Sequence, residues 1–333
     1  MKYILKKYWI HLTFLLIIYI PILLIATIRT DYSLILKGDT QKFNSVVEIE
    51  SDYKEEGSFS TIYVINMPKS TILQNLITAS ASTIEKYKIS SSSTHINDIE
   101  NYNSGKIDYY SSIEIAIIQA YTEAQKVNAD IKIDYSFFSY DVTWYSENSQ
   151  FRIGDRIIGI DDVYSDKPKL IEKIRNMTGE ETFHIIRGNN NLDIKWNKEN
   201  DSISISERYK IDYDNIYPKL KIKDTNIGGP SGGLLQTLSI YNRLVEEDLT
   251  HGLKIAGTGT INSNGTVGKI GGIREKIPTA LDDNIDIFLC AKGNYDDALD
   301  AYNSLNGRSK MKLVCIETFS DAINYLRGYK DEI

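Results

Sequence analysis

Cysteine is scarce in this sequence of 333 residues, since only Cys290 and Cys315 are present. Both lie in apolar, strand-like runs, IFLCA and KLVCI, which favour buried thiols and leave a disulfide between adjacent strands open. The four histidines share no motif, and no Cys/His spacing typical of a metal site occurs. The sequence therefore predicts no metal site and offers no histidine as an obvious catalytic base.

Net positive charge and phosphate-binding loops are missing as well. The formal net charge of −7 argues against nucleic acid as the main partner. The run GTVGK is followed by Ile270 in place of the Ser or Thr of a phosphate loop, and GTGTIN departs from the dinucleotide fingerprint at Asn262. Because no Walker motif is present either, the sequence predicts no ATP binding and no other cofactor.

The longest uncharged stretch lies near the N-terminus. Residues 9–28 contain no Asp, Glu, Lys or Arg, and as a helix they would span about 30 Å, the thickness of a bilayer core. Lys2, Lys6 and Lys7 precede this run, so the positive-inside rule predicts a cytoplasmic tail over residues 1–8. A cleaved signal peptide is the rival, but the run is long for one and no clear cleavage site follows. We expect a single-pass cell-membrane anchor with the rest of the chain outside.

Residues 29–130 carry no recognisable catalytic residue. Residues 45–66 alternate like two strands around a charged turn, and 72–77 read as a helical turn. The serine-rich run 90–94 is typical of a solvated loop, and an amphipathic helix is expected from Ser111. We interpret this N-terminal extracytoplasmic region as spacer and support.

The most informative stretch begins with GGPSGG, residues 228–233. Gly228 and Gly229 permit backbone angles that other residues avoid, and a helical pattern follows directly. Ser231 is therefore expected on a tight turn at a helix N-terminus, where free N–H groups and the helix dipole favour a developing oxyanion. The helical pattern is carried by Leu234, Leu235, Leu238, Tyr241, Leu244 and Val245.

A nucleophilic serine needs a base, and Lys276 in GGIREK is the candidate. Only His251 is near in sequence, and no other feature marks it as a base. A lysine can serve when its pKa is strongly lowered, as burial and a position near a helix N-terminus would do. We expect a helix to start over Ile273 to Leu281, and the neighbouring Arg274 to disfavour a second positive charge nearby.

Each motif alone has an ordinary explanation: GGPSGG could be a flexible linker, and AGTGTI, residues 256–261, a strand with a glycine bulge. In this order and spacing the three motifs resemble the proteolytic domain of Lon-type Ser–Lys proteases, over residues 206–333. The resemblance implies Ser231 as nucleophile, Lys276 as general base and Thr258 as a residue that orients the pair. Two departures are Gly232, where alanine is usual, and Gly228, where ATP-dependent members often have an acid.

Residues 131–205 resemble a PDZ domain, with a turn of the GD-I-hydrophobic-I-D/N-G kind, a helix and closing strands. The match is carried by Gly154, Asp155, Ile157, Ile158, Ile160 and Asp161. Asp162 stands where glycine is common, and no carboxylate-binding loop is recognisable near Phe137. Capture of extended peptides at a sheet edge and a module that only packs on the protease both stay open.

The order of anchor, PDZ-like module and Lon-type domain resembles the membrane-anchored PDZ–Lon peptidases of Gram-positive bacteria, the SepM-like group. The resemblance implies a mixed α/β fold and an ATP-independent serine endopeptidase at the outer membrane face, which acts on exposed peptides or proteins. The backbone N–H groups around Ser231 and Gly232 are expected to bind the oxyanion. Lon-type domains often form rings, which leaves a homo-oligomer open. The alternative is a non-catalytic surface scaffold with an inert protease-like domain, and a different acyl transfer is a weaker one.

Overall fold

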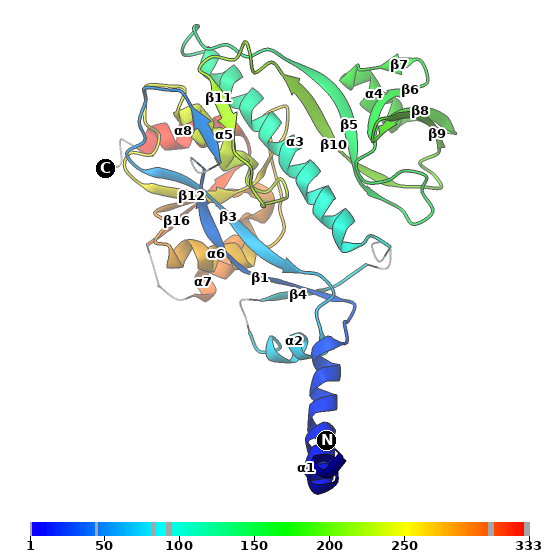
Figure 1. Cartoon of the computed structure of the whole chain (residues 1–333). Helices are drawn as coiled ribbons and strands as arrows, with labels where there is room; N and C mark the ends of the chain where they lie inside the picture. Colours follow the sequence, from blue (N-terminus) through cyan, green and yellow to red (C-terminus); the bar gives the residue numbers. More distant parts are fainter. Residues whose placement is uncertain (1, 44–45, 82–83, 91–94, 306–309, 330–333) are drawn as a thin grey trace.

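The computed structural model describes residues 2–43, 46–81, 84–90, 95–305 and 310–329. Figure 1 shows a long helix, α1 (Lys2–Thr27), that extends away from a folded body. Its segment Lys7–Thr27 is long and apolar enough to cross a membrane, and none of it is buried against the rest of the chain. The helix expected at residues 9–28 is confirmed, although a signal sequence has the same appearance. Residues 91–94 of the expected serine-rich loop lie outside the described residues.

The body is built around a six-stranded sheet with the strand order β16-β15-β12-β3-β1-β4. These strands are β1 (Tyr32–Lys42), β3 (Ser58–Met67), β4 (Glu85–Lys88), β12 (Lys254–Thr258), β15 (Ile287–Ala291) and β16 (Lys312–Ile316). β12 runs parallel to both β3 and β15, so the two ends of the chain meet in the middle of the sheet. Residues 29–130, which we interpreted as spacer and support, thus supply β1, β3 and β4 to this central sheet.

Helices cover both faces of the central sheet, which explains why the central strands are apolar throughout. The five residues of β15, IFLCA, are all buried, as is typical of a parallel strand covered on both sides. One face packs against α3, α5 and α8, and the other against α6 and α7. Their bounds are α3 (Asp98–Gln125), α5 (Gly233–Asn242), α6 (Ile273–Asp282), α7 (Tyr295–Ser304) and α8 (Phe319–Tyr329).

α3 is longer than the sequence pattern indicated. The apolar face expected after Ser111 is confirmed, because Ile113, Ala116 and Ala120 are fully buried. The helix nevertheless begins at Asp98, with Asn97 and Glu100 forming a reciprocal capping box. Its first half, rich in Asn, Ser and Tyr, has no helical apolar period, which is why the start was not predicted.

We call the central sheet and the helices that cover it the central unit. A second sheet lies beside this unit, in the order β10-β5-β6-β8-β9, with β7 paired to β6 (Figure 1). We call residues 135–211 the β-module. It contains β5 (Tyr135–Tyr145), β6 (Arg156–Ile160), β7 (Val163–Tyr164), α4 (Lys167–Asn176), β8 (Glu181–Arg187), β9 (Asn190–Trp196) and β10 (Ile203–Ile211). The expected GD turn is present: Gly154 has φ of 88°, and the buried Asp155 binds the guanidinium of Arg187.

The expected boundary between the PDZ-like and Lon-type regions, between residues 205 and 206, falls within β10. This strand pairs along its whole length with β5, from Ile203 opposite Tyr145 to Ile211 opposite Tyr135. Its alternating sequence indicates a strand but not the partner of that strand. The β-module is therefore an insertion between α3 and the later part of the central unit.

The open edge of the β-module faces α3. Arg208 on β10 binds Glu114 of α3 with 2.6 Å between Nη2 and Oε1, and also contacts Asp141 of β5 at 3.2 Å. The backbone N–H of Tyr209 donates to the other oxygen of Glu114, at 2.8 Å. A partly buried ion pair with added hydrogen bonds fixes relative position well, so the edge strand is held against the central unit.

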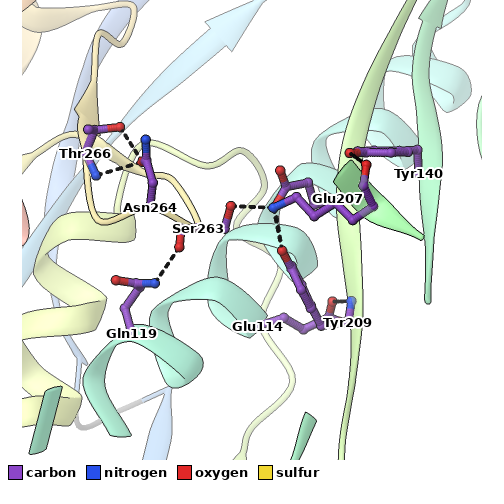
Figure 2. A network of polar contacts seen from close by, with 9 residues as sticks. Glu114, Gln119, Tyr140, Glu207, Tyr209, Ser263, Asn264 and Thr266 are labelled. Atoms are coloured by element: carbon purple, nitrogen blue, oxygen red, sulfur yellow. Dashed lines mark hydrogen bonds and ion pairs between the residues drawn. The ribbon is translucent and has the colours of Figure 1, made fainter. Parts of the chain in front are cut away.

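A second contact joins the β-module to the loop between β13 (Thr260–Ile261) and β14 (Val267–Gly268). Nζ of Lys167 lies 2.8 Å from Glu207 Oε2, 2.8 Å from Tyr209 Oη and 2.5 Å from Ser263 Oγ. Figure 2 shows Glu207, Tyr209 and Ser263 converging, while Gln119 of α3 donates to the carbonyl of Ser263 at 2.8 Å. The loop is thus held by α3 on one side and by the β-module on the other.

The two cysteines are free and lie opposite one another on the neighbouring parallel strands β15 and β16. Cys290 is buried as expected, and burial raises the pKa of its thiol to about 12. The expectation of a buried thiol was wrong for Cys315, which is exposed. β16 is the edge strand of the sheet, so a strand pattern alone could not distinguish the two environments.

Candidate functional site

Ser231 lies on the turn that leads into α5. Gly232 is the N-cap and the helix begins at Gly233, so the predicted position just before a helix is confirmed. Gly229 has φ of 85° and its N–H donates to the carbonyl of Gly105 in α3, at 2.7 Å. The turn therefore needs glycine at 229 for its backbone conformation, and α3 holds it in place.

The end of β12 supports this turn from the other side. The carbonyl of Ser231 accepts hydrogen bonds from the N–H of Gly259 at 2.9 Å and from Oγ1 of Thr258 at 3.0 Å. The N–H of Leu234 donates in turn to the carbonyl of Gly259, at 3.0 Å. These reciprocal bonds fix the backbone of Ser231 against the central sheet.

Lys276 reaches the same point from the first turn of α6. Its side chain is almost fully enclosed, with 1% of the residue exposed. Nζ lies 3.1 Å from Oγ of Ser231, 3.2 Å from Oγ1 of Thr258 and 2.7 Å from the carbonyl oxygen of Ile62. The structure thus brings Ser231, Thr258 and Lys276 together around one amine.

All three neighbours of this amine are uncharged oxygen atoms. Burial without a carboxylate partner disfavours the ammonium form and lowers the pKa of Lys276 to about 8. The expected contribution of Arg274 was wrong, because its guanidinium points to the surface and lies 3.3 Å from Asp297. Burial is the cause of the shift.

Gly232 offers a backbone donor next to Ser231. The N–H of Gly233 is bonded to Pro230 and that of Leu234 to Gly259. Among the described residues, no acceptor is paired with the N–H of Gly232 or with that of Ser231. A Cβ at position 232 would come within 2.9 Å of the methyl group of Thr61, which gives a physical reason for glycine at this position.

Ile62 is the contributor that sequence reasoning missed. It lies on β3, in the region that we interpreted as support, and acts only through its backbone carbonyl. Because any residue has that carbonyl, no side-chain signal could have identified it. Only knowledge that β3 pairs with β12 beside the site could have done so.

The histidines lie elsewhere. Nε2 of His251 is 2.9 Å from the carbonyl of Leu326 in α8, and Nδ1 of His184 contacts Asp193 in the β-module. Within the described ranges, no group of three or more His, Cys, Asp or Glu side chains is placed to hold a metal ion. The amine of Lys276 is therefore the basic group that contacts Ser231.

Comparison with known proteins identifies one part of the chain. Residues 215–327 match the family described as Lon protease (S16) C-terminal proteolytic domain. The Lon protease of Campylobacter jejuni is 31% identical over 115 residues, which are 34% of this chain and 14% of that protein. A Lon proteolytic domain is thus present in the chain, and its matched range contains Ser231, Thr258 and Lys276.

Proposed function

Because this chain contains a Lon proteolytic domain, which points to a serine protease, we propose that it is a serine endopeptidase with a Ser231–Lys276 dyad. The observation that carries the proposal is the 3.1 Å separation between Oγ of Ser231 and Nζ of the buried Lys276. That separation is within reach of direct proton transfer. A pKa near 8 leaves part of the amine neutral at physiological pH, so the base is available.

The hydrogen-bond pattern around Nζ favours the neutral amine as the acceptor of the serine proton. The carbonyl of Ile62 can only accept, and Thr258 Oγ1 already donates its hydrogen to the carbonyl of Ser231. Both must therefore accept from Nζ, which uses the two hydrogens of a neutral amine. The remaining lone pair then faces Oγ of Ser231, which is the orientation that a general base requires.

The reaction follows from this arrangement. Lys276 accepts the proton of Ser231 as Oγ attacks the carbonyl carbon of a peptide bond, and the oxyanion forms next to the N–H of Gly232. Loss of one such donor typically costs about 3 kcal/mol in serine hydrolases. Lys276 then donates the proton to the leaving amine, the C–N bond breaks, and an acyl ester on Ser231 remains. A water molecule activated by the same amine hydrolyses that ester and restores both residues.

In this proposal the substrate binds as an extended strand along β3. β12 pairs with β3 only as far as Thr61, whereas β1 pairs with it on the other side up to Met67. Among the described residues, the edge of β3 from Ile62 to Met67 has no strand partner on the β12 side. This edge starts at the residue that binds Lys276, so a polypeptide added there would pass Ser231.

The rest of the chain restricts the substrates. No phosphate loop is present, so we expect no ATP-driven unfolding, and accessible peptides or unfolded segments are the targets. The chain matches only 14% of the Campylobacter jejuni protein, whose other activities are therefore not carried over. With α1 as a retained anchor, and with Lys2 and Lys6 before its apolar segment Lys7–Thr27, the catalytic unit lies at the outer face of the cell membrane.

In this proposal the β-module is a fixed support and does not bind the C-terminal tails of peptides. In peptide capture by strand addition, an open edge strand supplies its backbone groups. On β10 the N–H of Tyr209 is already bonded to Glu114, and Arg208 is held by the same carboxylate. This occupied edge disfavours capture of a peptide at β10.

The test is digestion of an unfolded protein and a peptide library by the full-length protein in detergent, beside the Ser231→Ala variant. Products that appear with the wild type and are absent with the variant are expected. Absence of products from both samples, with a folded wild type, would contradict the endopeptidase and support a scaffold. Equal products from both would contradict Ser231 as nucleophile.

A further inference from the structure

A short helix, α2 (Ile72–Ile77), lies beside the C-terminal end of α1 (Figure 1). The N–H of Ile72 donates to the carbonyl of Ile28 at 3.1 Å, and the N–H of Thr30 donates to the carbonyl of Ser70 at 2.8 Å. Nδ2 of Asn75 donates to Oγ1 of Thr30 at 2.9 Å. These hydrogen bonds hold α2 beside the C-terminal end of α1 and fix the two helices relative to one another.

α2 exposes its large aliphatic side chains instead of burying them. Leu76 is 62% exposed and Ile77 is 69% exposed, and no residue of α2 is buried. The helix is nevertheless well formed, since Thr71 and Gln74 make a capping box. Single exposed aliphatic residues are common, but this adjacent pair lies on a helix that is hydrogen-bonded to the end of the exposed apolar helix α1.

The length of α1 sets the depth of this surface in a bilayer. The apolar segment Lys7–Thr27 has 21 residues, and at about 1.5 Å per residue it measures roughly 32 Å, close to the ~30 Å of the hydrocarbon core. Ile28, which is bonded to the first residue of α2, therefore falls at the boundary between acyl chains and headgroups. Amphipathic elements at this boundary bury their apolar side chains about 5–10 Å deep.

Two basic residues lie close to this boundary in the chain. Arg29 comes two residues after the end of the apolar segment, and its Nη1 lies 3.4 Å from the carbonyls of Pro68 and Lys69. Lys69 itself comes two residues before the N-cap of α2, Thr71. Cations at headgroup level are attracted to anionic lipid, so the charge pattern agrees with the apolar one.

We propose that α2 is a membrane-interface element, in which Leu76 and Ile77 insert into the boundary of the outer leaflet. The bilayer is the occupant of this surface because α2 is hydrogen-bonded to Ile28, the residue that follows the proposed membrane-spanning helix. Two contacts, α1 and α2, then fix the tilt of the catalytic body on the membrane, which one helix alone would not do. The proposal rests on membrane anchoring by α1.

The experiment uses the full-length protein in vesicles of three parts phosphatidylcholine to one part phosphatidylglycerol. A single exposed cysteine is introduced by Ile77→Cys in a Cys315→Ser background, in which Cys290 stays buried, and is labelled with a small environment-sensitive fluorophore. Val127→Cys is the matched control, because Val127 is also an exposed aliphatic residue, at 61%, and follows the end of α3 far from α1. Ile18→Cys in α1 reports insertion of the anchor. Quenching is compared between nitroxide carried on lipid and iodide in water.

At position 77 we expect at least twofold stronger quenching by lipid nitroxide than at position 127, together with protection from iodide. If position 18 is quenched by lipid nitroxide while position 77 behaves like 127, the proposal for α2 is overturned and the anchor stands. If position 18 is not quenched either, anchoring fails and the proposal fails with it. Peptide hydrolysis by the same samples tests the endopeptidase separately, since none of these positions is at Ser231.

Discussion

Two lysines in this molecule, each in the first turn of a helix, have opposite surroundings. Lys276 on α6 lies in a closed niche and contacts only a carbonyl and two hydroxyl oxygens. Lys167 at the start of α4 has a side chain that is 24% exposed and contacts the carboxylate of Glu207 at 2.8 Å. One belongs to the Lon proteolytic domain, and the other joins the β-module to it.

The comparison shows how different the surroundings of two lysines can be, and only those of Lys276 suit the base that we propose. Where no acid is in contact, burial lowers the pKa of the amine, to about 8 for Lys276. Where a carboxylate and a phenol contact the amine, as at Lys167, the residue holds two parts of the structure together. We therefore expect substitution of Lys276 to affect peptide hydrolysis, and substitution of Lys167 to affect the contact between the β-module and the Lon proteolytic domain.

The largest expected difference is in peptide hydrolysis. Lys276→Met should lower kcat at least about 10³-fold, as should Ser231→Ala, and the double variant should be no worse because the two residues act as a unit. Lys167→Met should stay within a few-fold of the wild type. Initial rates on a fluorogenic peptide mixture check this. Comparable losses at 167 and 276 would remove the distinction between base and support.

The next effect concerns Thr258, which connects the niche to the backbone of Ser231. Thr258→Val keeps the shape but loses the hydroxyl that contacts Nζ at 3.2 Å and the carbonyl of Ser231 at 3.0 Å. We expect kcat to fall roughly 10- to 100-fold, since a misaligned base loses part of the 10²- to 10⁴-fold gain of acid–base catalysis. KM should change little. Thr258→Ser, which restores the hydroxyl, should recover most of the activity, and a Ser variant as impaired as Val would contradict this role.

A stability measurement should also distinguish the two lysines, because we expect substitution of Lys276 to stabilise the protein at pH 7 and substitution of Lys167 to destabilise it. The folded pKa of Lys276, about 8, lies below the ordinary value of 10.5. Between these values the unfolded chain binds the proton more strongly, so the free energy of unfolding of the wild type rises with pH. Below pH 8 the buried amine costs about 3 kcal/mol, taken from the pKa difference. Lys276→Met should therefore be more stable at pH 7, with an advantage that shrinks towards pH 10.5.

Denaturant unfolding in detergent at pH 7 and at pH 10 measures this advantage. Lys167→Met, which removes a contact and no buried unpaired charge, should show no such pH-dependent gain. A Lys276→Met variant that is less stable than the wild type at pH 7 would mean that the amine is fully compensated in the folded protein.

The smallest effect is expected at the junction. Lys167→Met should cost about 1 kcal/mol, since it removes hydrogen bonds to Glu207, Tyr209 and Ser263 without opening a core. The loss should be local and should appear as faster amide hydrogen exchange in β10 and in the β13–β14 loop. Lys169→Met, on the same helix with a side chain that is 69% exposed, is the matched control. Equal exchange in both variants would show that Lys167 does not hold the β-module.

The features of the fold and of the site that could be predicted are those whose sequence signal is local in the chain. Ser231 and Lys276 were found because Gly-rich turns and helical periodicity are local, and each lies at the start of a helix as predicted. That their side chains lie 3.1 Å apart could not be read from local pattern, and was inferred from the resemblance. The carbonyl of Ile62 had no signal at all, because a backbone atom acquires its role only through the pairing of distant strands.

The strand partners show the same limit. β10 pairs with residues of β5 that lie 58 to 76 positions earlier in the chain, so no local pattern identifies the pairing. β3 was recognised as a strand, but its parallel pairing with β12 joins segments that are far apart in the chain. The sequence therefore predicted the elements, and the positions of Ser231 and Lys276 at helix starts, better than it predicted which elements form one unit.

The central claim, an uncharged amine of Lys276 in contact with the Ser231 hydroxyl, is tested most directly by the pH dependence of Ser231 phosphonylation. The second-order rate constant of the full-length protein with a small fluorophosphonate should rise between pH 6 and 9 as a one-proton curve. Its midpoint should lie near the pKa of about 8, and the rate of Lys276→Met should be low at every pH. A rate for the wild type that is the same at pH 6 and at pH 9, or a Lys276→Met variant that reacts as fast as the wild type, would contradict the account.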